Sequence, residues 1–138
     1  LSRPYRLIGR IIPGRAKGKQ LGFPTANMGP TDQLVPTEGV YAGLVQIGDS
    51  EQQVCAATAK LPAAVSIGRA ETLGGDNPLV IEAHILTGDV GDLHGKWLAM
   101  DFIHRIRSQK KFDTEKELAA QIEKDCKTAK QILAKQQE

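Results

Sequence analysis

Short apolar segments, separated by clusters of Gly, Pro and Asp, constrain the fold of this chain more than any other feature. That spacing is typical of all-β barrels and sandwiches, because these turn residues tolerate the sharp backbone geometry that joins antiparallel strands. We predict strands at residues 5–12, 40–47, 54–58, 63–67, 79–86 and 97–106. Six strands suffice to close a small barrel, so we expect one across residues 5–107.

Size and charge limit what such a domain does. With 138 residues the chain is long enough for one core and too short for two. Its 18 Lys and Arg nearly balance its 16 Asp and Glu, which argues against a long nucleic-acid footprint. No apolar run approaches the ~20 residues that span a bilayer. Cys55 and Cys126 lack metal or disulfide spacing, so we expect reduced thiols and a cytoplasmic protein that binds neither membranes nor nucleic acid.

The last segment changes from a strand-like to a helical period. Apolar residues that recur at three- and four-residue steps form one stripe: Leu118, Ile122, Cys126, Ala129 and Leu133. Thr114 followed three residues later by Glu117 predicts a capping box at the start of this helix. We therefore expect a helix over about residues 114–135 that packs on the barrel, and a helix that docks on a partner protein is the alternative.

Residues 14–22 are rich in glycine and positive charge. Arg15, Lys17 and Lys19 alternate with small or glycine residues, a composition that suits a loop around phosphates. The spacing is not that of a Walker A loop, because three residues separate Gly14 from Gly18 and a glutamine follows Lys19. Taken alone, the segment fits a nucleotide site and a solvated basic turn equally well.

The sequence that follows this loop carries a family resemblance. Gly22-Phe23-Pro24-Thr25-Ala26-Asn27 resembles the signature of riboflavin kinases, including the kinase module of bacterial bifunctional FAD synthetases. The blocks that continue the resemblance along nearly the whole chain lie at residues 34–36, 39–42, 66–68, 81–86, 91–95, 105–107 and 111–113. The resemblance implies a six-stranded antiparallel, Greek-key-like barrel with a C-terminal helix packed on it. It also implies phosphorylation of the terminal ribityl hydroxyl of riboflavin by ATP, giving FMN and ADP.

The resemblance assigns the nucleotide and metal sites to the first loop and to the residues directly after it. The residues that it implies for ATP binding are Gly14, Lys17, Gly18, Lys19, Gly22, Pro24, Thr25 and Asn27. Thr25 and Asn27 are also the implied ligands of a divalent ion, and their hydroxyl and amide oxygens are hard donors that suit Mg²⁺. Hydrogen bonds from these two side chains to the turn backbone are the alternative.

Glu82 is the candidate catalytic residue. Strand alternation places Glu82 and His84 on the face opposite Ile81, Ala83 and Ile85. From the residues alone Glu82 fits a solvent-facing carboxylate, whereas the resemblance assigns it the role of general base. His84 fits an ordinary structural histidine. The three histidines recur every ten residues without a Cys or His neighbour at ligand spacing, so we predict no zinc site.

The basic loop before the helix is the implied flavin site. The resemblance assigns flavin contacts to Arg107, Gln109 and Phe112, and a guanidinium fork and an aromatic ring suit the polar edge and the face of a flavin. The alternative is a solvated charge run with Phe112 packed beneath the helix.

Some positions depart from the family pattern, namely Ala16, Ala70, Glu71, His94 and Gln109. They keep open a non-catalytic flavin- or nucleotide-binding barrel. An oligonucleotide-binding barrel is a weaker alternative, because aromatic residues are few and do not alternate with basic ones. The first residues, Leu1-Ser2-Arg3-Pro4-Tyr5, resemble the junction at which the kinase module of a bifunctional enzyme begins. We therefore expect a covalently linked N-terminal adenylyltransferase domain in the full-length protein.

Overall fold

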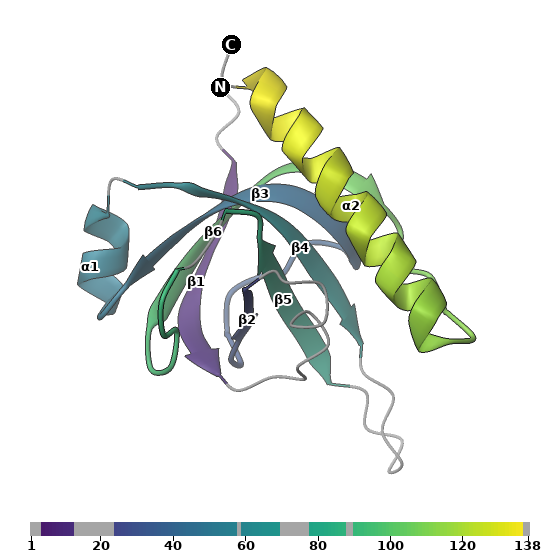
Figure 1. The fold of residues 1–138 in the computed structure, drawn as a ribbon. Coiled ribbons are helices and arrows are strands. Elements are labelled where there is room, and N and C mark those ends of the chain that lie inside the picture. Colours follow the sequence, from purple (N-terminus) through teal and green to yellow (C-terminus); the bar gives the residue numbers. More distant parts are fainter. Residues whose placement is uncertain (1–3, 13–23, 58, 70–77, 88–89, 137–138) are drawn as a thin grey trace.

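The strands form a barrel (Figure 1), and the strands β3 (Gly39–Gly48) and β5 (Leu79–Ile85) are largely buried. The computed structural model describes residues 4–12, 24–57, 59–69, 78–87 and 90–136. Its strands are β1 (Tyr5–Ile12), β2 (Thr25–Met28), β3 (Gly39–Gly48), β4 (Leu61–Arg69), β5 (Leu79–Ile85) and β6 (Trp97–Arg107). The helices are α1 (Glu51–Ala56) and α2 (Glu115–Gln136).

The strands close in the order β1-β2-β5-β4-β3-β6, and every neighbouring pair is antiparallel. Strands β3, β4 and β5 follow one another as hairpins, and β6 then returns to lie beside β3. A fourth strand that returns beside the first of three consecutive strands is a Greek key. The predicted fold class, a six-stranded Greek-key-like barrel with a C-terminal helix, is confirmed.

Two elements differ from the sequence prediction. The strand predicted at 54–58 is wrong, because residues 51–56 form α1, and Thr58 lies outside the described residues. The hydroxyl of Ser50 caps this helix by accepting the amide of Gln53, and Val54 is its buried residue. The sixth strand of the barrel is instead β2, at residues where we predicted no strand. Its alternation of polar and apolar residues lasts only four residues, which is the lower limit of a strand signal.

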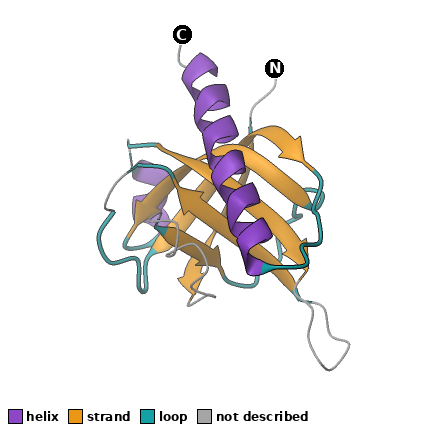
Figure 2. Cartoon of the chain, turned by 45° about the vertical axis from the view of Figure 1, so that its right-hand side comes forward, coloured by secondary structure: helices purple, strands orange, loops and turns teal. Residues whose placement is uncertain are grey.

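Apolar side chains gather in two layers, one inside the barrel and one between its outer face and α2. The interior is built on fully buried residues such as Leu7, Val45 and Met100. In the outer layer, Cys126, Ala129 and Leu133 of α2 pack with side chains of the barrel. Figure 2 shows α2 lying across the strands, as predicted from its apolar stripe. The barrel side of this layer is formed by Ala42, Ala64 and Leu86.

A threonine cap begins α2. The hydroxyl of Thr114 accepts a hydrogen bond from the backbone amide of Glu117 at 3.1 Å, as the capping box predicts. The carboxylate of Glu117 accepts a hydrogen bond from the backbone amide of Asp113. In a capping box the donor would be the amide of the next residue, Thr114. Among the described residues, no helix has the length and apolar character that a bilayer crossing requires.

The packing of α2 predicts a large cost for truncating Leu133, which is 4% exposed. Leu133→Ala is expected to lower the free energy of unfolding by about 2–4 kcal/mol, since it leaves a cavity between helix and barrel. Gln131→Ala, on the exposed side of the same turn, is the matched control and is expected to change it by less than about 0.5 kcal/mol. Urea unfolding measures both, and equal effects would contradict this packing.

Candidate active site

The candidate site is a pocket of about 470 Å³ between the outer face of the barrel and the N-terminal half of α2. Its floor comes from the adjacent strands β2, β5 and β4, and its wall from α2 and the segment that follows β6. Polar side chains on the floor are Asn27, Ser66, Glu82 and His84. Apolar side chains that line it include Leu79, Val80, Phe112, Leu118 and Ile122. The apolar stripe of α2 therefore has two roles: its C-terminal half packs on the barrel, and its N-terminal half lines the pocket.

Strand pairing brings the polar floor residues into two adjacent rows. Glu82 of β5 pairs with Asn27 of β2 on one side and with Ser66 of β4 on the other. His84 pairs in the same way with Thr25. Directly paired residues in antiparallel strands point to the same face, so these side chains gather on the outer face of the barrel. The structure thus brings together the predicted base, Glu82, and the predicted metal ligands.

Close polar contacts connect the two rows through His84. The Nε2 atom of His84 lies 3.2 Å from Oε1 of Glu82, and its Nδ1 atom lies 3.2 Å from Oγ1 of Thr25. The imidazole is 6% exposed and the Glu82 side chain 18% exposed. Burial lowers the pKa of His84 to about 4, outweighing the negative charge of Asp125, which acts in the opposite direction. The ring is therefore neutral near pH 7.

The wall of the pocket is fixed by an ion pair that the sequence analysis missed. The guanidinium of Arg107 donates to both carboxylate oxygens of Asp125, with Nη2 to Oδ2 at 2.7 Å and Nε to Oδ1 at 3.0 Å. The two side chains are only 14% and 6% exposed. Gln121 also donates to Asp125, at 3.0 Å. The sequence does show an acidic residue, Asp125, next to Cys126 of the apolar stripe. No pattern in the sequence indicates that its partner is Arg107.

The other predicted flavin contacts also line this pocket. The amide nitrogen of Gln109 donates to the hydroxyl of Ser66 at 2.9 Å and to the carbonyl of Ile67 at 2.8 Å, which ties the loop to β4. The Phe112 ring lies with its centroid 6.0 Å from Cζ of Arg107. Arg107 and Gln109 thus donate hydrogen bonds to other residues of the protein, while Phe112 contributes an apolar surface to the wall.

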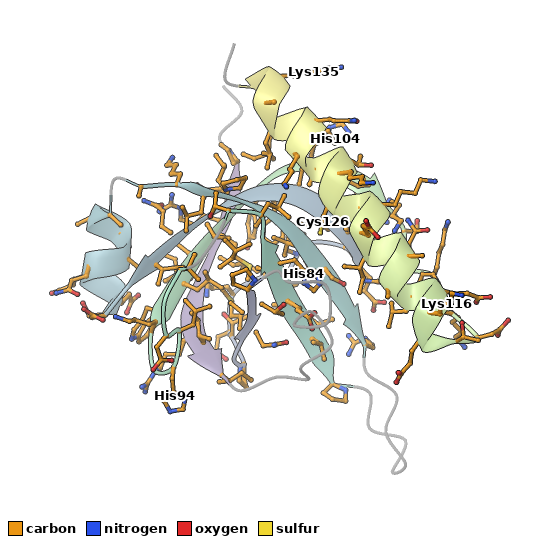
Figure 3. The ribbon with its side chains drawn as sticks, in the orientation of Figure 1. His84, His94, His104, Lys116, Cys126 and Lys135 are labelled. Carbon is orange, nitrogen blue, oxygen red and sulfur yellow. The ribbon has the colours of Figure 1, made fainter. Side chains whose placement is uncertain are left out.

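Part of the predicted nucleotide site lies outside the described residues, namely Gly14, Lys17, Gly18, Lys19 and Gly22, together with the departures Ala16, Ala70 and Glu71. Pro24 lies at the start of β2, where its carbonyl accepts the amide of Ile85 at 2.9 Å. His94 is exposed, and its amide donates to Asp92 in a turn between β5 and β6. Figure 3 shows His84, His94 and His104 well separated.

The donors on β2 fit a magnesium ion that shares its ligands with phosphates. Thr25 and Asn27 alternate along β2, so they share a face, and Asn27 is 7% exposed. Mg²⁺ commonly takes only one or two protein ligands and completes its shell with waters and phosphate oxygens. Within the described part of the chain, no three His, Cys, Asp or Glu residues form a metal cluster. Two neutral oxygens suit a site that forms with the nucleotide.

Fold and site together define a small-molecule-binding barrel with a carboxylate beneath a helix-walled pocket. The flavokinase family model, described as riboflavin kinase, matches residues 1–133. The chain belongs to the riboflavin kinase family.

Individual relatives place the match within longer proteins. A bifunctional riboflavin kinase/FMN adenylyltransferase of Haemophilus influenzae is 35% identical over 130 residues, which cover 94% of this chain and 39% of the relative. The crystal structure of a riboflavin kinase from Trypanosoma brucei superposes with a TM-score of 0.68 at 27% identity, covering 99% of this chain and 83% of that one. A macrolide-efflux protein from Streptococcus pneumoniae superposes with a TM-score of 0.73 at 28% identity, covering 92% of this chain and 38% of that one.

The Arg107–Asp125 pair predicts a strong dependence of stability on Asp125. Asp125→Ala is expected to lower the free energy of unfolding by about 3–5 kcal/mol, because it leaves a buried guanidinium without its carboxylate. Glu123→Ala is the control, since Glu123 forms an exposed pair with Lys127 on the same helix and is expected to matter by less than about 1 kcal/mol. Denaturant unfolding measures both variants. Equal losses of unfolding free energy would show that the buried pair contributes no more than the exposed one.

His84 predicts a pH dependence of stability. Its pKa is about 4 in the folded chain and 6.5 when exposed, so between these values the unfolded chain binds more protons. Stability is therefore lost as the pH falls from 6.5 to about 4, and this histidine contributes no slope above that window. Across it, the native chain is expected to lose about 3 kcal/mol more than His84→Gln. Urea unfolding at several pH values measures the difference, and parallel curves would contradict a buried neutral ring.

Proposed function

We propose that this chain transfers the γ-phosphoryl group of ATP to the terminal ribityl hydroxyl of riboflavin, forming FMN and ADP. The observation that carries the proposal is the position of Glu82 on the polar floor of the pocket, between Asn27 and Ser66 and 3.2 Å from the imidazole of His84. Membership of the riboflavin kinase family supports the choice of substrate.

The pocket suits a flavin in size and in polarity. Its volume of about 470 Å³ falls within the range of about 300–1,000 Å³ that is usual for small-molecule sites. The apolar wall that includes Phe112, Leu118 and Ile122 fits a flat aromatic ring system. The polar floor fits a hydroxylated chain, which would reach toward Glu82.

In the proposed reaction, Glu82 accepts the proton of the ribityl hydroxyl as its oxygen bonds to the γ-phosphorus and the bond to ADP breaks. Thr25 and Asn27 would hold Mg²⁺, which offsets the negative charge of the phosphates when it is bound. The glycine-rich loop with Gly14, Gly18 and Gly22 remains our prediction for the cover of the nucleotide, with Lys17 and Lys19 supplying positive charge. Pro24 would set the start of β2 beside it.

The hydrogen bonds of Arg107 and Gln109 refine the proposed flavin site. Because their donors hold Asp125 and β4, we assign these two residues to shaping the wall. Phe112 is the residue of this group that we propose to contact the flavin ring. Lys110 is exposed and also lines the pocket, so it would add positive charge there.

The chain spans about two fifths of the length of the curated relatives that it matches, 39% for the Haemophilus influenzae protein. We propose that it is the kinase module of a bifunctional enzyme with an N-terminal adenylyltransferase domain, acting in the cytoplasm. The unpaired thiols of Cys55 and Cys126 are compatible with that compartment. On this proposal the isolated chain makes FMN without FAD. A flavin- or nucleotide-binding barrel without activity is the alternative function, and the departures from the family pattern favour testing it.

Turnover with riboflavin, ATP and Mg²⁺ tests the function, with chromatography separating FMN from FAD. Glu82→Gln is expected to lower the rate of FMN formation by about 10²–10⁴-fold, because it removes the proton acceptor at nearly constant volume. Glu51→Gln, an exposed acid on α1, is the control and is expected to leave the rate unchanged. Flavin binding without any FMN would support the non-catalytic alternative, and full activity of Glu82→Gln would rule out the assigned base.

The two donors on β2 predict a metal-dependent loss of nucleotide binding. Thr25→Val and Asn27→Leu each remove a hard oxygen, so each is expected to weaken ADP binding in the presence of Mg²⁺ by about tenfold or more. Thr87→Val is the matched control, because Thr87 is exposed and lies outside this pocket. Calorimetric titration with and without Mg²⁺ measures the effect. Unchanged affinity in both variants would place the ion elsewhere.

A further inference from the structure

We propose that His84 is a positioning residue that orients the proposed base and a proposed metal ligand at the same time. The inference rests on the function proposed above and deepens it. It begins from one observation: the two nitrogens of this ring contact Glu82 and Thr25, one on each side.

The place of His84 in the sheet makes both contacts possible. His84 lies two residues after Glu82 on β5, so both side chains point to the outer face. On β2, Thr25 is the direct pairing partner of His84. The ring therefore lies between a neighbour along its own strand and a neighbour across the sheet. With 6% of the side chain exposed, it has little freedom to leave this position.

The chemistry of the partners selects one tautomer. A carboxylate only accepts hydrogen bonds, so the Nε2 atom that faces Glu82 must carry the proton and donate it. In the neutral ring, Nδ1 is then an acceptor, and the hydroxyl of Thr25 must donate to it. The opposite tautomer would place a lone pair of Nε2 against the carboxylate.

This tautomer prepares both partners for the reaction. One oxygen of Glu82 faces Nε2–H, a contact that fixes the plane of the carboxylate that takes the substrate proton. The hydroxyl hydrogen of Thr25 points to Nδ1, so its lone pairs are directed away from the ring and toward a cation.

Two substitutions separate the two contacts. Asn places an amide oxygen near the position of Nδ1 and keeps an acceptor for Thr25, whereas Gln places an amide nitrogen near Nε2 and keeps a donor for Glu82. His84→Asn is expected to lower kcat about tenfold with KM for Mg²⁺-ATP within about twofold. His84→Gln is expected to raise that KM about fivefold or more and to lower kcat less. His104→Gln, at an exposed position, is the control.

A double-mutant cycle tests whether His84 acts through Glu82. In single-turnover assays, His84→Asn is expected to cost about tenfold in the native chain and less than about twofold in the Glu82→Gln chain, because the oriented base is already gone. An equal loss in both backgrounds would overturn the proposal. So would proportional changes of kcat and KM in both His84 variants, which indicate a general loss of packing.

A measurement on the native chain needs neither folding of a variant nor turnover. Nitrogen-15 NMR of the imidazole is expected to show the proton of His84 on Nε2 at pH 7, with Nδ1 unprotonated. A proton on Nδ1 would overturn the proposal even if FMN is formed. Failure of the native chain to form FMN would instead remove the proposed function, so the two failures are distinct.

Discussion

The pairing of β2 with β5 is the interaction on which the rest of this structure depends. Strand β2 has four residues, yet it joins β1 to β5 and thereby closes the barrel. The same pairing sets Asn27 beside Glu82 and Thr25 beside His84. A one-residue slip would turn these side chains into the apolar interior and expose Ala26 and Met28, which are buried there. Closure of the barrel and assembly of the site therefore depend on the same strand pairing.

Helix α2 turns this polar surface into a pocket. Small residues of the barrel, Ala42 and Ala64, take part in the layer against which its C-terminal half packs. Its N-terminal half lines the pocket, where the buried pair of Arg107 and Asp125 ties it to the end of β6. The geometry of the pocket wall thus depends on an ion pair between two elements, and Gln109 adds a bond from the following loop to β4.

The sequence predicted what local patterns determine. Alternation located most strands and placed Glu82 and His84 on one face, and the three- and four-residue period located α2. It missed β2 because the alternation of Thr25 and Asn27 with Ala26 and Met28 lasts only four residues. It misread α1 because the apolar residues that begin at Val54 and end this six-residue helix look like the start of a short strand. It also missed Asp125, because an ion pair across 18 residues leaves no local signal. The role of His84 emerges only from its neighbour across the sheet, Thr25.

We propose that the pocket beneath α2 binds riboflavin with its terminal hydroxyl at Glu82. The most direct measurement is a crystal structure of Glu82→Gln with riboflavin, ADP and Mg²⁺, since this variant is expected to retain its ligands. We expect the flavin ring against Phe112, the terminal ribityl oxygen within about 3.2 Å of the side chain at position 82, and the ion on Thr25 and Asn27. A flavin bound elsewhere, or one with its ribityl chain directed away from β5, would contradict it.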